Sequence, residues 1–172
     1  GAHGLAASLG GILNLLFLGF GGPVAVLAAG GSEMLAEMGL VYLRITVMAA
    51  PMVFVLSVNS DALRNEGLVL FMAAMSLLTS VANIGFNYVL IGILEMGVAG
   101  SAYGTALAQA LALSVIVAFR AYGDTALRPS VIWQHSPFAG WGYIIALGAP
   151  QSLNFIGLAL GSAAILVALQ LV

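Results

Sequence analysis

The stretch LVLFMAAMSLLTSVANIGFNYVLIGIL, residues 68–94, holds no charged side chain and lies between the polar turn 64–67 and Glu95. A bilayer has a hydrocarbon core about 30 Å thick, which a helix crosses with roughly 20 apolar residues. This stretch is long enough to do so. We therefore expect residues 68–94 to form a membrane-spanning helix.

The rest of the chain has the same apolar character. Hydrophobic residues make up 62% of it and charged residues 6%, and its mean hydropathy is +1.14. Soluble domains carry about 25% charged residues, so lipid is the expected main solvent. The expected fold is an all-α polytopic membrane protein with about five transmembrane helices, because four more apolar runs are present: residues 5–29, 40–63, 98–119 and 141–172.

The ends of the sequence and its few charges add two expectations. The sequence starts and stops inside apolar regions without an initiator Met or a signal pattern, so we expect further helices of a longer chain as partners. Residues 120–140 are expected to form a polar loop. The side richer in arginine is expected to be cytoplasmic. If the spans alternate, Arg64, Arg120 and Arg128 lie on that side, and Glu33, Glu37 and Glu95 lie on the other.

Polar side chains recur at helical spacing inside three of the apolar runs. Lipid-facing positions need no polar atoms, so such residues indicate a protein or water interior. The three sets are Ser76, Ser80, Asn83 and Asn87; Ser101, Thr105 and Gln109; and Gln151, Asn154 and Ser162.

These polar residues have two readings. As links between helices, each hydrogen bond contributes about 0.6 kcal/mol, and we favour this reading for the serines. An unpaired amide in hydrocarbon is costly, so a functional role weighs as much as a structural one for Asn83, Asn87 and Thr105. Their oxygens could bind a hard cation such as Na⁺, weakly because the site is neutral.

Two prolines and two histidines complete the inventory. Pro51 and Pro150 lie inside apolar runs, where a proline leaves a carbonyl without its donor, so both are expected to bend their helices. His3 and His135 lie at the edge of the sequence and in the loop, so no serine in a span has a base within the membrane. We expect no enzyme activity, no cofactor and no nucleic-acid partner.

Four short motifs carry a resemblance to a known family. They are LRNEG at 63–67, NIGFNY at 83–88, MGVAGSA at 96–102 and TALAQ at 105–109. In order and spacing they resemble the multidrug and toxin extrusion (MATE) transporters. The resemblance implies the third to seventh helices of a two-lobe, twelve-helix fold. Residues 1–120 would then be part of the first lobe, 121–140 the cytoplasmic inter-lobe loop, and 141–172 the first helix of the second lobe.

The resemblance also implies functional residues. A cation site of the first lobe would fall on Asn83, Asn87 and Thr105, with Na⁺ or H⁺ as the coupling ion. Asn87 stands where some relatives carry aspartate, which removes one titratable group. The polar sets would line the substrate cavity through Ser76, Ser80, Gln109 and Asn154.

The expected function is that of a cation-coupled antiporter in the cell (inner) membrane. It would export drugs or other small organic, often cationic, compounds by alternating access. One alternative is a lipid-linked oligosaccharide flippase of the same superfamily, although no lysine or arginine lies deep in the predicted spans. The other is a non-transporting membrane scaffold whose polar residues only join helices.

Overall fold

The computed structural model describes residues 1–30, 32–123, 136, 138 and 140–170, apart from the side chains of residues 27, 151, 154–155, 159 and 162–170. Nearly all of the described chain is helical. The helices are α1 (Ala2–Ala28), α2 (Glu33–Asn65), α3 (Val69–Asn87), the π-helix η1 (Tyr88–Ile93), α4 (Gly97–Tyr122) and α6 (Trp141–Gln170).

The predicted fold class is confirmed. Each predicted apolar run coincides with a helix, apart from short differences at the ends. Among the described residues, 4 helices are long and apolar enough to cross a membrane: Ala2–Val26, Glu33–Asn65, Val69–Ile93 and Gly97–Tyr122. The helix α6 occupies the fifth predicted run. The chain is therefore an all-α polytopic membrane protein.

Two predicted helix boundaries are wrong. The run expected from residue 40 begins at Glu33, because the Ser32 hydroxyl caps α2 by accepting a hydrogen bond from the Leu35 N–H at 3.4 Å. The loop expected from Arg120 begins later, because α4 continues through Arg120 to Tyr122. A cation is tolerated inside this helix end because a carboxylate of α2 pairs with it, as described below.

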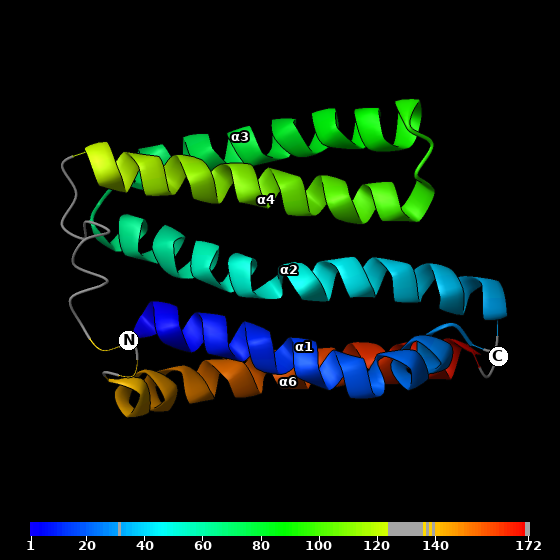
Figure 1. The fold of residues 1–172 in the computed structure, drawn as a ribbon. Coiled ribbons are helices and arrows are strands. Elements are labelled where there is room, and N and C mark those ends of the chain that lie inside the picture. The colour runs from blue at the N-terminus through cyan, green and yellow to red at the C-terminus, as the bar shows by residue number, and fades with distance from the viewer. Residues whose placement is uncertain (31, 124–135, 137, 139, 171–172) are drawn as a thin grey trace.

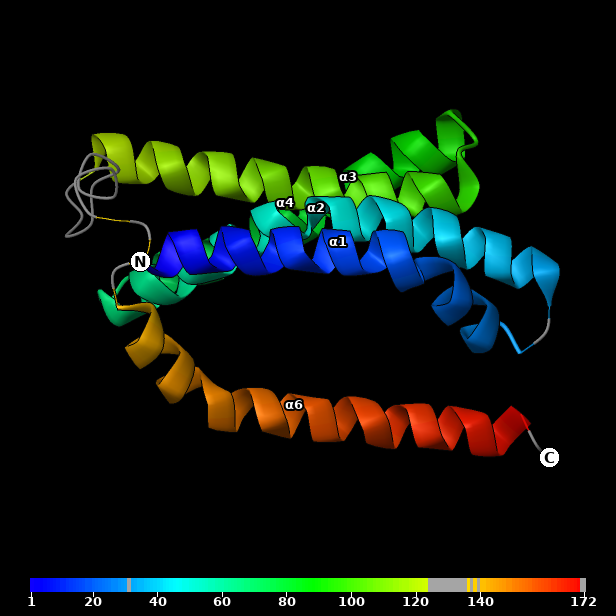
Figure 2. The ribbon, with the colours of Figure 1, turned by 60° about the horizontal axis from the view of Figure 1, so that its bottom comes forward.

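The helices pack in the order α1, α2, α4, α3 (Figure 1). The helix α4 lies against both α2 and α3, whereas α2 and α3 touch only slightly. Among the described helices, α6 meets only α1, and Figure 2 shows it set apart from the others. Trp141 at the start of α6 donates from Nε1 to the Gly1 carbonyl oxygen at 3.1 Å. The helices α1 to α4 therefore form one packed unit, in which the polar residues of the predicted site lie.

The two prolines predicted as bending points lie inside helices. The helix α2 runs on through Pro51, and Pro150 lies in α6, which changes direction near its beginning in Figure 2. Gly10 of α1 packs against the backbone of Pro51, where a Cβ on the glycine would collide with the proline Cα. The glycine-rich first run thus packs closely on α2, as expected of small residues at membrane helix interfaces.

The buried core of the unit lies near the end of the bundle where α2 meets α3. Phe71 stacks on Phe119 there, with ring centroids 4.1 Å apart. The core cluster consists of Leu63, Met72, Met75, Ala112 and Ile116.

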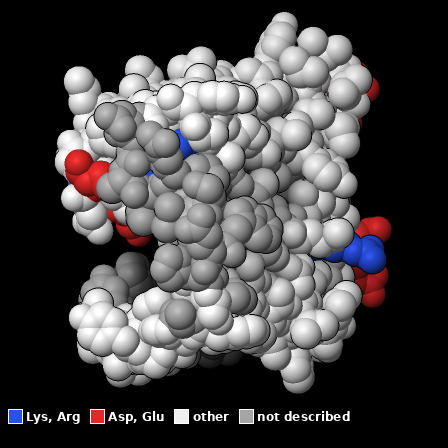
Figure 3. All heavy atoms as spheres, turned by 60° about the vertical axis from the view of Figure 1, so that its left-hand side comes forward, with Lys and Arg blue, Asp and Glu red and all other residues white. Residues whose placement is uncertain are grey.

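Two arginines and two of the glutamates lie at opposite ends of the bundle. Arg64 and Arg120 lie at the end where α2 and α4 finish, each beside a carboxylate, and Glu33 and Glu95 lie at the other end. Figure 3 is turned toward the arginine end and shows few charged atoms, some of them with blue and red side by side. The alternation of the spans therefore separates these arginines from these glutamates in the predicted way.

Candidate functional site

Two glycines of α4 bring the end of α3 unusually close. Gly100 and Gly104 are buried one turn apart. A Cβ on Gly100 would lie 3.1 Å from the carbonyl carbon and oxygen of Leu90 in η1, and one on Gly104 would collide with Oδ1 of Asn87. The small residues at this spacing therefore form the contact surface between α4 and the α3–η1 segment.

The close approach lets polar side chains of the two helices join. Asn87 Nδ2 donates to Asn83 Oδ1 at 3.1 Å, and Asn83 Nδ2 donates to Thr105 Oγ1 at 3.2 Å. The Thr105 hydroxyl donates in turn to the Ser101 carbonyl oxygen at 3.1 Å. The structure thus brings together the three residues predicted as cation ligands, Asn83, Asn87 and Thr105. We call this arrangement the amide chain.

A change of helix type borders the amide chain. Asn87 is the last residue of α3, and the π-helix η1 begins at Tyr88. The backbone N–H of Leu94 bonds to the Val89 carbonyl oxygen at 2.9 Å, five residues back. Short π-helical segments inside α-helices occur frequently at functional sites because they redirect side chains locally.

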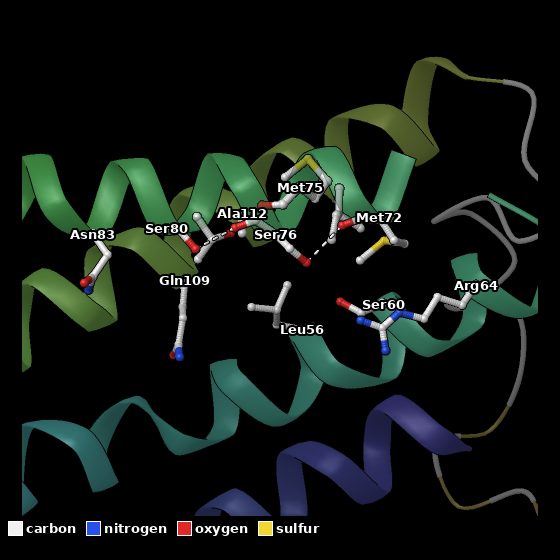
Figure 4. Close-up of a pocket in the computed structure, with 12 residues that line it drawn as sticks. Leu56, Ser60, Arg64, Met72, Met75, Ser76, Ser80, Asn83, Gln109 and Ala112 are labelled. Carbon is white, nitrogen blue, oxygen red and sulfur yellow. Dashed lines mark hydrogen bonds between the residues drawn. The ribbon is translucent and has the colours of Figure 1, made fainter. Parts of the chain in front are cut away.

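Beside the amide chain lies a groove of about 370 Å³ between α2, α3 and α4. Three residues predicted to line the substrate cavity, Ser76, Ser80 and Gln109, line this groove together with Asn83 (Figure 4). The side chain of the fourth, Asn154, lies outside the described residues. A second cavity of about 220 Å³, between α1, α2 and α4, is lined by Thr105 and again by Gln109.

The hydroxyls of the groove bond within their own helix. Ser76 donates to the Met72 carbonyl at 3.0 Å, Thr79 to the Met75 carbonyl at 2.8 Å, and Ser80 to the Ser76 carbonyl at 3.0 Å (Figure 4). Among the described residues, Ser76 and Ser80 thus donate to the preceding turn of their own helix and not to another helix. Their lone pairs remain available to a ligand.

An ion pair between the end of α2 and the end of α4 was missed by the sequence reasoning. Arg120 Nη1 donates to Glu66 Oε1 at 2.9 Å, with side chains 2% and 15% exposed, and Nη2 reaches the Asn59 carbonyl oxygen at 3.4 Å. The pair fastens the end of α2 to the end of α4. The sequence did contain a signal for this pair. Glu66 and Arg120 each follow the end of a predicted span, and both ends lie on the same predicted side of the membrane.

The donor set of the site is neutral. Within the part of the chain that the structure describes, no three His, Asp or Glu side chains gather as a metal site. The amide chain offers amide and hydroxyl oxygens instead. Such a set suits a weakly held hard cation better than a structural metal ion.

Sequence comparison finds relatives among vertebrate proteins. Multidrug and toxin extrusion protein 1 of Danio rerio is 28% identical over 129 residues, which cover 74% of this chain and 22% of that protein. Its counterpart in Xenopus tropicalis is 26% identical over 117 residues, covering 66% and 20%. Multidrug and toxin extrusion protein 2 of Mus musculus is 22% identical over 116 residues, covering 67% and 20%.

The chain spans about a fifth of the length of these relatives. No protein-family model matches it. No solved structure matches it either. The resemblance expected from the four sequence motifs is nevertheless confirmed, and the chain is a multi-pass membrane protein similar in sequence to the multidrug and toxin extrusion proteins.

Proposed function

We propose that the protein is a cation-coupled antiporter of the cell (inner) membrane that exports drugs or other small organic compounds by alternating access. The names of its relatives, which refer to the extrusion of drugs and toxins, support this proposal. The observation that carries it is the amide chain, which joins α3 to α4 through polar side chains inside apolar spans.

The chemistry of the amide chain favours Na⁺ as the coupling ion. The chain supplies three side-chain oxygens, from Asn83, Asn87 and Thr105, and hard cations prefer oxygen ligands. None of these side chains takes up or releases a proton near neutral pH, so proton coupling would need another group. Weak binding by neutral oxygens suits an ion that must leave again in every transport cycle.

The position of Asn83 provides a route for coupling. A cation held by these oxygens would replace the Asn83–Thr105 hydrogen bond, which ties α3 to α4. Asn83 also lines the groove, so an organic compound bound there would contact the same side chain. Ion and compound would then bias the same pair of helices, and each would favour the conformation to which it binds more tightly.

Alanine substitutions at the asparagines test the proposal. In cells that express the protein from its own reading frame, Asn83→Ala and Asn87→Ala are expected to abolish Na⁺-dependent efflux of ethidium, with unchanged protein levels. Asn14→Ala is the matched control, because among the described residues the Asn14 amide bonds to the Gly10 carbonyl of its own helix at 3.0 Å and to no other helix. Efflux by both asparagine variants at the level of the control would refute the proposed site.

A further inference from the structure

Asn87 carries a buried oxygen of the amide chain that takes part in no hydrogen bond. Its Oδ1 is buried without a partner among the described residues. Asn83 Oδ1 and Thr105 Oγ1 each accept a bond from the preceding member of the chain. A buried acceptor without a donor has lost its water and gained nothing in exchange, which is costly and rare in folded proteins. This oxygen therefore calls for a physical explanation.

The direction of the hydrogen bonds leaves this oxygen free. The Ser101 carbonyl can only accept, so the Thr105 hydroxyl proton points toward it. Thr105 Oγ1 then accepts from Asn83 Nδ2, which turns the Asn83 oxygen toward Asn87. Asn87 donates to that oxygen from its own Nδ2. If the Asn87 amide were flipped, Asn87 Oδ1 would face Asn83 Oδ1, and two acceptors would repel each other.

Gly104 provides the space in which this oxygen lies. The glycine is buried in α4, and a Cβ there would collide with Asn87 Oδ1 and would lie 3.4 Å from the Asn87 backbone nitrogen. The Asn87 amide has little freedom to move aside, because Asn83 holds its nitrogen at 3.1 Å. A glycine Cα offers at most a weak C–H contact, so the oxygen keeps its lone pairs.

We infer that Gly104 is a positioning residue of the candidate cation site: the missing Cβ leaves the place in which Asn87 Oδ1 lies unbonded, and a bound cation would supply the partner that this buried oxygen lacks. The inference rests on the proposed function, because it names how the same site is kept ready. Asn83 Oδ1 and Thr105 Oγ1 each accept one hydrogen bond already and keep one lone pair, whereas Asn87 Oδ1 accepts none.

Thermal unfolding of the purified protein in detergent tests this role, with NaCl compared against choline chloride. Na⁺ that binds the folded state raises the Tm by mass action. Gly104→Ala is expected to raise the Na⁺ concentration for half of this effect by about 10- to 100-fold, as for other residues that orient metal ligands. Gly85→Ala is the matched control, because a Cβ on Gly85 of α3 meets nothing within 4 Å.

A purely structural role for Gly104 gives a different result. The Tm of Gly104→Ala would then fall equally in both salts, and its half-effect Na⁺ concentration would equal that of the unsubstituted protein, which would overturn the inference. If Gly104→Ala does not fold, the double variant Asn87→Ala, Gly104→Ala is expected to fold as well as Asn87→Ala alone, because the collision partner is gone. Failure of the double variant to fold also overturns the inference.

The proposed function can fail separately in the same experiment. An unsubstituted protein whose Tm is identical in both salts would refute Na⁺ binding itself, and the inference with it. A Na⁺ response that survives unchanged in Gly104→Ala would refute the role of Gly104 alone.

Discussion

At the scale of single residues, burial separates two arginine–carboxylate pairs at the same end of the bundle. Arg120 and Glu66 pair at 2.9 Å with side chains 2% and 15% exposed, whereas Arg64 and Asp61 pair at 3.6 Å with side chains 55% and 69% exposed. Charges in the buried pair have given up water and depend on each other. The exposed pair is screened by solvent, so each member is stable without the other.

Removing one carboxylate from each pair tests this difference. Glu66→Gln removes the carboxylate that pairs with the buried Arg120 guanidinium and is expected to destabilise the fold by about 3–5 kcal/mol. Asp61→Asn is the matched control and is expected to cost about 0–1 kcal/mol. Thermal unfolding in detergent measures both losses of stability. Equal losses would show that Glu66 contributes no more to stability than the exposed Asp61.

Residue spacing predicted one part of these contacts and could not predict the other. The four-residue step from Asn83 to Asn87 places both on one face of a helix, and the structure joins them there. The pairing of Arg120 with Glu66 links positions 54 apart. Such a pair depends on which helices become neighbours, and hydrophobic periodicity within one helix carries no information about that.

At the scale of helices, α1 and α2 come closest where a glycine of α1 faces the proline of α2. Gly10 lies directly on the backbone of Pro51. The proline removes one backbone hydrogen bond of α2, and the glycine lets α1 approach that place closely. The contact therefore depends on the missing Cβ of Gly10, whereas the adjacent Gly11 meets nothing within 4 Å.

A methyl group at each of these glycines has a contrasting expected effect. Gly10→Ala is expected to destabilise the protein by about 1–3 kcal/mol, because the backbone of α2 cannot yield as a flexible side chain does. Gly11→Ala has open space and should be neutral or slightly stabilising, since alanine favours the helix. The Tm values of the two variants in detergent decide the matter, and a Gly10→Ala protein as stable as Gly11→Ala would contradict the contact.

The internal geometry of the helices was harder to predict than their existence. Residues 68–94 read as one uninterrupted apolar run, yet the helix changes to a π-helix at Tyr88. Hydropathy is blind to this change, because the same apolar residues satisfy both helix types. The change accompanies the packing of Leu90 against Gly100, a tertiary contact. For the same reason, spacing placed Ser76 and Ser80 on one face but did not show that their hydroxyls bond backward.

At the scale of the whole molecule, the chain alternates direction, and Arg64 and Arg120 lie at the end opposite to Glu33 and Glu95. Ser32 precedes α2 at one end, where Glu95 follows η1, and Asn65 closes α2 at the opposite end near Arg64. The positive-inside rule predicts a cytoplasmic location for the end with Arg64 and Arg120.

Single cysteines test this orientation, because the chain contains no native cysteine. In intact cells, a membrane-impermeant maleimide is expected to label Ser32→Cys and Glu95→Cys. Asn65→Cys should be labelled only after the cells are permeabilised. Labelling of Asn65→Cys alone in intact cells would show the reverse orientation.

The arrangement of the helices relative to one another could not be predicted from apolar runs. All five runs were recognised because lipid demands long apolar helices, but lipid tails are as apolar as leucine and give no preference for a neighbour. The structure sets α6 apart from α2, α3 and α4 and in contact with α1 (Figure 2). Small residues such as Gly10 and Gly104, which decide the close contacts, are indistinguishable by hydropathy from glycines that touch nothing.

The pairing of Glu66 with Arg120 also bears on the order of events during synthesis. The helices α1 and α2 form one hairpin and α3 and α4 another, and both can close as soon as their own residues leave the ribosome. Glu66 follows the first hairpin, and its partner Arg120 lies 54 residues later, near the end of α4. Until α4 has been synthesised, the Glu66 carboxylate is therefore expected to be hydrated at the membrane surface. This ion pair can therefore form only after the end of α4 has been synthesised, whereas the contact between α1 and α2 does not depend on α4.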